Sequence, residues 1–412
     1  MTLEIPNKVY TREATEARLL GGYGPFAAVG GFVLLALIAS STPTPLYSIY
    51  AAEWGFSPLA VTEVYAVYAI GVLVALLLTG GLSDLIGRRP VMISALLGLI
   101  TAEVAFMFAG GLEWLYAARS VQGLSTGLLL GATGAALVDL HPRRDGGQAG
   151  LVNGIASAAG IGIGAGLSGL LVQFAPDPEV TPYVVVAVLA AGAAATAWML
   201  PETVARTGRV TLTPRVPRVP RALWRTFSLS ALGVTASWAV GGLYLSLGPG
   251  IISEILGDQN HAVGGLFVFS VCAFAALAQY LLRDVATRPT VVGGATLLVV
   301  GSLITAGTIA ADSLAGFLAG SALVGLGFGA AFMGALRSLA AQLPPAHRAG
   351  VMSAFFVVAY TAISIPAIGA GVAAVHIGIG SAAAWFGCGV ALVAAAVAIV
   401  GWNELRPAAR TP

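Results

Sequence analysis

Apolar runs about as long as a membrane-spanning helix recur along the whole chain. A helix needs roughly 20 mostly apolar residues to cross the hydrocarbon core of a bilayer, and we count about twelve such runs. They lie at 26–48, 59–82, 90–110, 112–140, 149–174, 181–200, 228–252, 262–283, 289–310, 313–341, 349–375 and 379–402. Lipid offers the backbone no hydrogen-bond partners, so these runs are predicted to be helices. The alternating segments of a β-barrel do not occur in the sequence.

The composition places most of the chain in lipid. Of 412 residues 58% are hydrophobic and only 9% are charged, whereas a soluble domain carries about 25% charged residues. The net charge of +2 gives no indication of a nucleic-acid partner. Cys272 and Cys388 lie inside apolar runs and the four histidines are scattered. We therefore expect no disulfide framework, no metal site and no cofactor.

Basic residues occur in every second connection between the runs. They are Lys8, Arg12 and Arg18; Arg88 and Arg89; Arg143 and Arg144; Arg206, Arg209, Arg215, Arg218, Arg221 and Arg225; Arg283 and Arg288; Arg348; and Arg406 and Arg410. The positive-inside rule then places both termini in the cytoplasm. The expected location is the plasma membrane, in a bacterium the inner membrane. A rival interpretation makes the first run a cleaved signal peptide, which would leave an odd number of spans.

Similar residues recur at matching positions in the two halves of the chain. Asp84 and Arg88 have counterparts at Asp284 and Arg288, and Ala149-Gly150 returns as Ala349-Gly350. An ordered series of such pairs indicates an internal repeat. We expect a cytoplasmic segment at 1–25, a first bundle of six helices at 26–201, a linker at 202–226, a second bundle at 227–403 and a tail at 404–412. The second copy is eroded, because Thr287 replaces the glycine and one arginine is missing.

One short polar turn between the second and third runs resembles a known signature. It reads GGLSDLIGRRP from Gly80 to Pro90, and it is similar to the loop between helices two and three of the major facilitator superfamily. Leu85 departs from the family pattern, which often has a basic residue there. The resemblance implies an all-α membrane protein with the major facilitator fold, in which twelve transmembrane helices form two pseudo-symmetric bundles. It points in particular to the twelve-helix drug:proton antiporter group.

The resemblance also implies a conformational latch at the cytoplasmic side. In the family an acidic residue at the end of helix four lies beside the arginine of the signature loop, so we expect Asp139 to pair with Arg88. Asp84 is expected to cap the start of the eleventh helix, where the helix dipole favours an anion. The other expected members are Gly80, Gly87 and Arg89.

Charged side chains inside spans are the best pointers to function. Leu115-x-x-x-Arg119-x-x-Gln122-Gly123 resembles a second family motif that is linked to proton transfer in antiporters. Arginine does not give up its proton, so Arg119 is expected to act on a nearby carboxylate or to hold an anionic substrate. The structural alternative is an internally paired or snorkelling arginine.

Glu63 and Glu103 are the candidate carboxylates for proton coupling. A carboxyl group buried in an apolar span favours its protonated form, and a neighbouring arginine favours the ionised form. Glu103 is the deeper of the two, and Glu63 can equally be an ordinary interfacial residue. The first run has no acidic residue, unlike that helix in some family antiporters.

Two interrupted spans suggest the substrate path. Pro43 and Pro45 break the first run, and Gly248-Pro249-Gly250 breaks the seventh; interrupted helices tend to line transport pathways. The candidate substrate-binding residues are Tyr47, Tyr50, Gln122, Trp238 and Tyr244.

These observations predict a secondary active transporter that works by alternating access, and not an enzyme. The expected activity is proton-coupled efflux of small hydrophobic or drug-like molecules by a monomer. The alternative is uptake of a small metabolite by symport or facilitated diffusion. It gains support from the missing acid in the first run and from Ala165, which stands where the antiporter motif of the fifth helix (Gly160, Gly164, Ser168 and Gly169 here) has proline.

Overall fold

The computed structural model describes residues 22–79, 82–204, 217–257, 260–311, 313–344 and 347–404, and all regular elements in these ranges are helices. Twelve of them are long and apolar enough to cross a membrane, which agrees with the predicted spans. The spans are α2 (Gly24–Ser41), α4 (Pro58–Thr79), α6 (Arg88–Met107), α7 (Leu112–Leu140), α8 (Gly146–Phe174), α9 (Thr181–Met199), α10 (Trp224–Ser246), α12 (His261–Leu281), α13 (Thr287–Ala310), α14 (Leu314–Ala340), α15 (Arg348–Ile377) and α16 (Ile379–Glu404). Shorter helices are α3 (Tyr47–Trp54), α5 (Leu82–Ile86), η2 (Arg221–Leu223) and α11 (Gly248–Leu256). Gly80, most of the predicted N-terminal segment and C-terminal tail, and residues 205–216 of the predicted linker lie outside the described residues.

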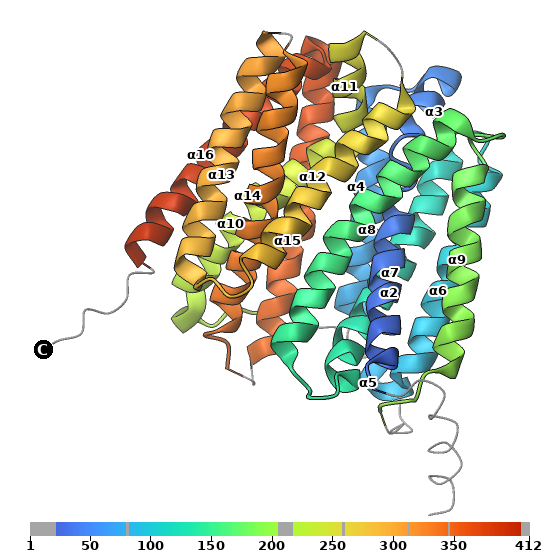
Figure 1. Ribbon diagram of the computed structural model, residues 1–412, viewed down its shortest axis with the longest axis vertical. Helices are drawn as coiled ribbons and strands as arrows, with labels where there is room; N and C mark the ends of the chain where they lie inside the picture. The colour runs from blue at the N-terminus through green and yellow to red at the C-terminus, as the bar shows by residue number, and fades with distance from the viewer. Residues whose placement is uncertain are drawn as a thin grey trace, which may run out of the picture.

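The spans form two six-helix bundles that lie side by side. Helices α2 to α9 make up one bundle and α10 to α16 the other, and the two meet along the centre of the molecule (Figure 1). The short helix α5 lies at the end that the arginine pattern assigns to the cytoplasm. Helices α3 and α11 lie at the opposite end (Figure 1), which we call the outer end.

The first span of each bundle is broken near the outer end. Helix α2 ends at Ser41 and α3 begins at Tyr47, and the gap contains Pro43 and Pro45, which lack the backbone N–H that a continuous helix needs. Helix α10 ends at Ser246, and α11 begins with Gly248 and Pro249. Both interruptions predicted from the sequence are therefore confirmed, and they occupy equivalent places in the two halves.

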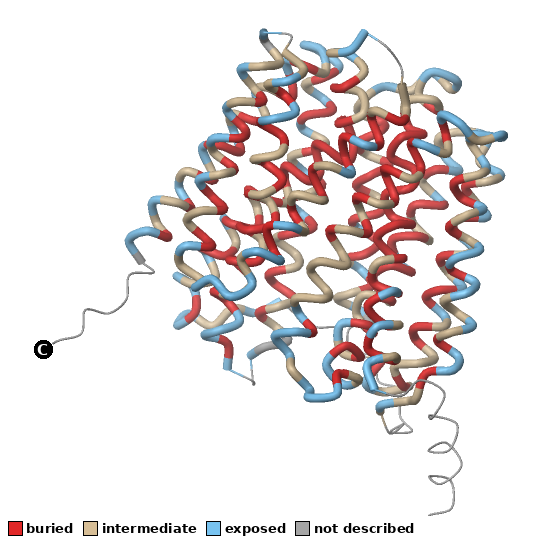
Figure 2. The backbone as a smooth tube through the Cα atoms, in the orientation of Figure 1, coloured by how far each residue is buried: buried red, intermediate tan, exposed pale blue. Residues whose placement is uncertain are grey.

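The two bundles contact each other closely through glycine-rich surfaces of α8 and α12. A Cβ atom added to Gly169 would lie only 2.9 Å from the Cα atom of Gly265, so the two backbones touch at this point. Beside it, the backbone N–H of His261 donates to Gln173 Oε1 (3.1 Å), and the His261 ring is 3.3 Å from Ser48 Oγ. Buried residues are dense here and along the centre of the molecule (Figure 2). The outer ends of the halves are thus in contact.

Candidate functional site

Arg119 lies in the interior of the first bundle without any exposure to solvent. Its guanidinium spreads over three acceptors. Nε donates to the Tyr47 hydroxyl (2.7 Å), as does one terminal nitrogen, and the other donates to the Ser40 carbonyl (2.7 Å) and to Gln122 Oε1 (2.5 Å). Ser40 lies in the last turn of α2 and Tyr47 begins α3, so these two acceptors of Arg119 flank the break between the helices. The planar fork of arginine suits such a spread of acceptors.

Gln122 links Arg119 to Glu103. Its amide nitrogen donates to Glu103 Oε1 (2.9 Å) and to the Ala39 carbonyl (2.9 Å), while its amide oxygen accepts from Arg119. Glu103 is fully buried, and its second oxygen, Oε2, has no hydrogen-bond partner. Arg119 and Glu103 form no direct ion pair in the described part of the chain. We call the four side chains Tyr47, Arg119, Gln122 and Glu103 the polar network.

Aromatic rings surround the cation of the network. The guanidinium carbon lies 5.2 Å from the ring centre of Tyr68, 5.4 Å from that of Tyr47, 5.9 Å from that of Phe106 and 6.0 Å from that of Tyr65. Each ring face attracts a cation, and more strongly where water is excluded. Tyr68 also lies in one hydrophobic cluster with Tyr360 and Trp238 of the second bundle. One aromatic side chain therefore contacts both the polar network and the other half of the molecule.

Glu63 lies outside this network. Its Oε2 accepts a hydrogen bond from the Tyr116 hydroxyl (2.9 Å), and the side chain is partly exposed near the outer end of α4. Of the two carboxylates predicted for proton coupling, the structure brings only Glu103 together with Arg119.

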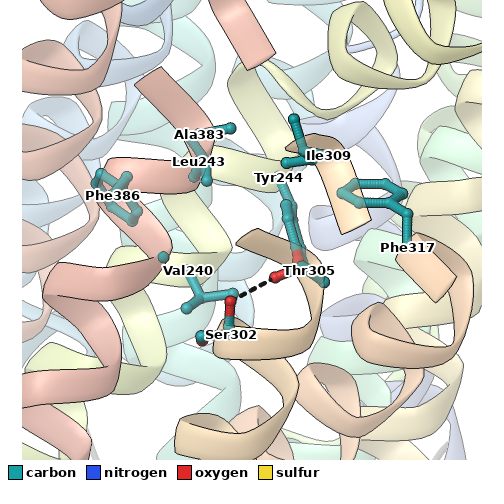
Figure 3. Close-up of a pocket in the computed structure, with 10 residues that line it drawn as sticks. Val240, Leu243, Tyr244, Ser302, Thr305, Ile309, Phe317, Ala383 and Phe386 are labelled. Carbon is teal, nitrogen blue, oxygen red and sulfur yellow. Dashed lines mark hydrogen bonds between the residues drawn. The ribbon is translucent and has the colours of Figure 1, made fainter. Parts of the chain in front are cut away.

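The predicted substrate-binding residues are spread over different surroundings. Tyr47 and Gln122 belong to the polar network, and Tyr50 is buried in the first bundle, where its hydroxyl bonds to that of Tyr183 (3.2 Å). Tyr244 lies inside the second bundle, with its hydroxyl 3.4 Å from Ser321 Oγ, and it lines a small pocket between α10, α13, α14 and α16 (Figure 3). Of the five residues, Trp238 lies at the junction of the two bundles.

The signature turn forms an ionic cluster around Arg88. Its Nε bonds to Asp139 Oδ2 (3.2 Å), as the resemblance implied, and the same side chain pairs with Asp84 and donates to Ser83 Oγ (2.7 Å). The Arg89 guanidinium lies over the ring of Trp198 at 5.4 Å. These contacts hold together α5, α6 and the ends of α7 and α9. The capping of the eleventh helix by Asp84 stays a prediction.

Glu202 is a member of this cluster that the sequence analysis did not identify. Its two carboxylate oxygens accept from the backbone N–H groups of Arg88 (2.9 Å) and Arg89 (3.2 Å) at the start of α6, where the helix dipole favours an anion. Gly87 makes this approach possible, because it adopts a φ of 107° and a Cβ there would lie 2.8 Å from the Glu202 carboxyl carbon. A signal was present: Glu202 is the single acidic residue in the otherwise arginine-rich segment 202–226.

The equivalent place in the second half is built differently. Arg337 lies near the end of α14, as Asp139 lies near the end of α7 in the first half. It donates to the carbonyls of Leu282 (3.0 Å) and Arg283 (2.7 Å) after α12, where a cation suits the helix dipole. Asp284 pairs with its neighbour Arg283 (3.2 Å) and is 84% exposed. The turn after α12 is therefore joined to α14 through an arginine on backbone carbonyls.

Comparison with known proteins identifies relatives of this chain. The sequence matches the family model of the Major Facilitator Superfamily over residues 29–257, more than half of the chain. It is 29% identical over 149 residues to a triacylglyceride transporter of Mycobacterium tuberculosis, which is 35% of this chain and 26% of that protein. It is 30% identical over 179 residues to a protein of Cronobacter sakazakii that by its name is assigned to multidrug resistance, MdtD; this covers 43% of this chain and 38% of that protein. The chain thus spans less than half the length of either relative.

A solved structure shares the fold over nearly the whole chain. The crystal structure of the human organic anion transporter MFSD10 (TETRAN) superimposes with a TM-score of 0.67, covering 91% of this chain and 98% of that one. The sequence identity is 18%, so the likeness concerns the fold alone.

Proposed function

Because the chain belongs to the major facilitator superfamily and is therefore a multi-pass membrane transporter, we propose that it exports small hydrophobic molecules in exchange for protons. Transporters of this architecture expose a central site alternately to the two sides of the membrane by rocking one bundle against the other. The outer ends of the bundles contact each other through α8 and α12, which supports an inward-facing state. The bacterial relatives support a location in the inner membrane.

The buried polar network is the observation that carries the proton part of this proposal. With Glu103 ionised, one negative charge lies close to the positive charge of Arg119, and Gln122 bridges the two. Protonation of Glu103 removes the negative charge and leaves Arg119 buried with neutral partners. An uncompensated buried charge costs several kcal/mol, so protonation favours a conformation in which Arg119 is better solvated. Proton binding is thereby coupled to the rocking of the bundles.

The link to the substrate is the aromatic contact between the halves. The ring centre of Tyr68 lies 5.2 Å from the Arg119 guanidinium carbon, and Tyr68 shares a hydrophobic cluster with Tyr360 and Trp238 of the second bundle. A shift of Arg119 therefore changes the surface at which a hydrophobic substrate enters between the bundles. The names of the relatives, a lipid transporter and a multidrug resistance protein, support a hydrophobic cargo.

Proton flux in liposomes tests this proposal. Purified protein is reconstituted with a pH-sensitive dye inside the vesicles, a pH gradient is imposed, and a panel of neutral and cationic dyes is added. Wild-type protein is expected to release protons in response to a transported dye. Glu103→Gln, which fixes the neutral form, is expected to abolish this proton movement while downhill dye exchange continues.

Glu63→Gln is the matched comparison, because Glu63 is a carboxylate of the same bundle that lies outside the network. It is expected to leave proton coupling intact. Loss of coupling in Glu63→Gln with full coupling in Glu103→Gln would refute the assignment to Glu103. Dye movement that never changes the internal pH would instead favour facilitated diffusion, which the absence of an acidic residue in α2 also favours.

A further inference from the structure

Trp238 is set apart from the other tryptophans of the chain by its position. Five of the seven lie more than half exposed: Trp114, Trp198, Trp224, Trp385 and Trp402. A sixth, Trp54, ends α3 at the outer end. These positions suit a side chain that prefers the boundary between lipid and water. Trp238 instead lies within α10, well away from either end of the helix.

The partly buried indole of Trp238 packs in clusters that contain aromatic side chains of both bundles. Its ring centre is 5.1 Å from that of Tyr360 in an edge-to-face contact and 5.6 Å from that of Phe332. Tyr68 of the first bundle and Phe356 of the second pack in the same clusters. We call these five residues the aromatic seam. They come from α4, α10, α14 and α15, so the seam lies where the bundles must separate during transport.

The seam contains a polar group with no partner. The indole N–H of Trp238 is buried and has no hydrogen-bond acceptor. One turn beyond Tyr360 on α15, the hydroxyl of Ser364 is also buried without a partner. Leaving such a group unpaired is unfavourable, and buried tryptophan N–H groups usually find an acceptor. A bound molecule that carries a hydrogen-bond acceptor gives the N–H of Trp238 its missing partner.

The charges of the site restrict which molecule can bring that acceptor. The charged side chain beside the seam is Arg119, whose guanidinium carbon lies 5.2 Å from the ring centre of Tyr68. Its N–H groups already bond to the polar network and to the Ser40 carbonyl. A cationic ligand would lose its hydration and meet this positive charge, and an anionic ligand would lose its hydration beside an arginine whose hydrogen bonds are already made; both are costly in an apolar site. An N–H edge is also the positive edge of an aromatic ring and does not attract a cation. Flat rings on several sides favour a flat, largely apolar ligand.

We propose that the aromatic seam binds uncharged, flat, apolar molecules through a carbonyl, ester or ring-nitrogen acceptor that receives the N–H of Trp238. This inference rests on the proposed transport function and gives its substrate class. Hydrocarbons that lack a hydrogen-bond acceptor, and permanent cations, are expected to bind the aromatic seam weakly.

Fluorenone and fluorene are suitable probes, because the two rigid tricyclic molecules differ by the carbonyl oxygen. Their dissociation constants are measured by equilibrium dialysis against purified protein in lipid nanodiscs, with empty nanodiscs subtracted. Fluorenone is expected to bind wild-type protein about tenfold more tightly than fluorene, the effect of one well-formed hydrogen bond. Trp238→Phe keeps an aromatic ring but loses the N–H, so the two ligands should bind it equally. Trp385→Phe, at a side chain that is 74% exposed, is the control and should preserve the tenfold ratio.

Two results would overturn the inference. One is equal dissociation constants of fluorenone and fluorene for the wild-type protein. This measurement does not depend on the folding of any variant. The other is tighter binding of N-methylacridinium than of fluorenone, lost in Trp238→Ala but kept in Trp238→Phe, because that pattern identifies a site for cations on the ring faces. Binding is measured without a pH gradient, so a failure of proton coupling in the liposome assay would leave the ratio unchanged. A normal proton response in liposomes, together with equal affinities for fluorenone and fluorene, would reject the substrate class and leave the proposed proton coupling standing.

Discussion

At the scale of single residues, the geometry of Arg119 matters as much as its charge. Arg119→Lys keeps the positive charge but cannot hold the Tyr47 hydroxyl, the Ser40 carbonyl and Gln122 Oε1 at once in the fixed geometry of a guanidinium. Proton-coupled dye efflux in liposomes is expected to fall at least about tenfold, which corresponds to the loss of one good hydrogen bond in the rate-limiting step. Arg143→Lys, at an exposed loop position, should transport as wild type. Equal rates for the Arg119 and Arg143 variants would mean that charge alone suffices.

Single residues were also where the sequence was least informative. The pairing of Arg88 with Asp139 was expected from the resemblance and is present at 3.2 Å. The role of Glu202 was not foreseen, because it caps a helix that begins 114 positions earlier in the chain. Nor did the sequence indicate that Tyr47 bonds to Arg119. Nearly all side chains in these spans are apolar, so periodicity does not distinguish the interior face of a helix from its lipid face.

At the scale of elements, the twelve spans were predictable because each needs its own apolar run. Most of their ends agree with the structure to within a few residues, and the two proline-containing breaks follow from the missing backbone N–H. The two faces of α8 were not predictable in this way. Gly160 and Gly164 face α2 within the first bundle, whereas Gly162 and Gly169 face α12 of the second. A run of small residues shows that a helix packs closely but does not name its neighbour.

The contact between α8 and α12 leads to a prediction about conformation. In Gly169→Ala the added Cβ would lie 2.6 Å from the His261 carbonyl and 2.9 Å from Gly265 Cα, so the helices must separate at the outer end. We expect the variant to favour the outward-open state and to transport more slowly. The distance between spin labels at residues 174 and 260, measured in a background without Cys272 and Cys388, should increase.

The control for this measurement is Gly192→Ala on α9, where a Cβ meets no atom within 4 Å. It should leave both the label distance and the transport rate unchanged. If the distance between the spin labels is unchanged in Gly169→Ala, the helices accommodate the extra methyl group by a local shift. The α8–α12 contact then does not set the balance between the inward-facing and outward-open states.

At the scale of the whole molecule, the repeat preserves architecture and not chemistry. Both bundles have six spans and a first span broken at the outer end. The four members of the polar network all lie in the first bundle, on α3, α6 and α7. The ionic cluster of the first half, centred on Arg88, is replaced in the second by Arg337 on the carbonyls that follow α12. A fold that needs only matching helix packing tolerates such divergence, so we expect the first half to carry the coupling.

A pair of matched variants tests this inequality of the halves. Asp139→Asn removes the charge that joins Arg88 to the end of α7 and also bonds to Thr203. Because Asp139 is 36% exposed, the contact is worth only about 1 kcal/mol, and transport is expected to slow about fivefold. Asp284→Asn is the same substitution in the second half, at a side chain that is 84% exposed and bonds to its chain neighbour, and it should transport at the wild-type rate. Fluorescence-detected gel filtration checks that both variants insert and fold. Equal slowing by the two substitutions would show that the turn of the second half has kept its role, and it would contradict the inequality of the halves.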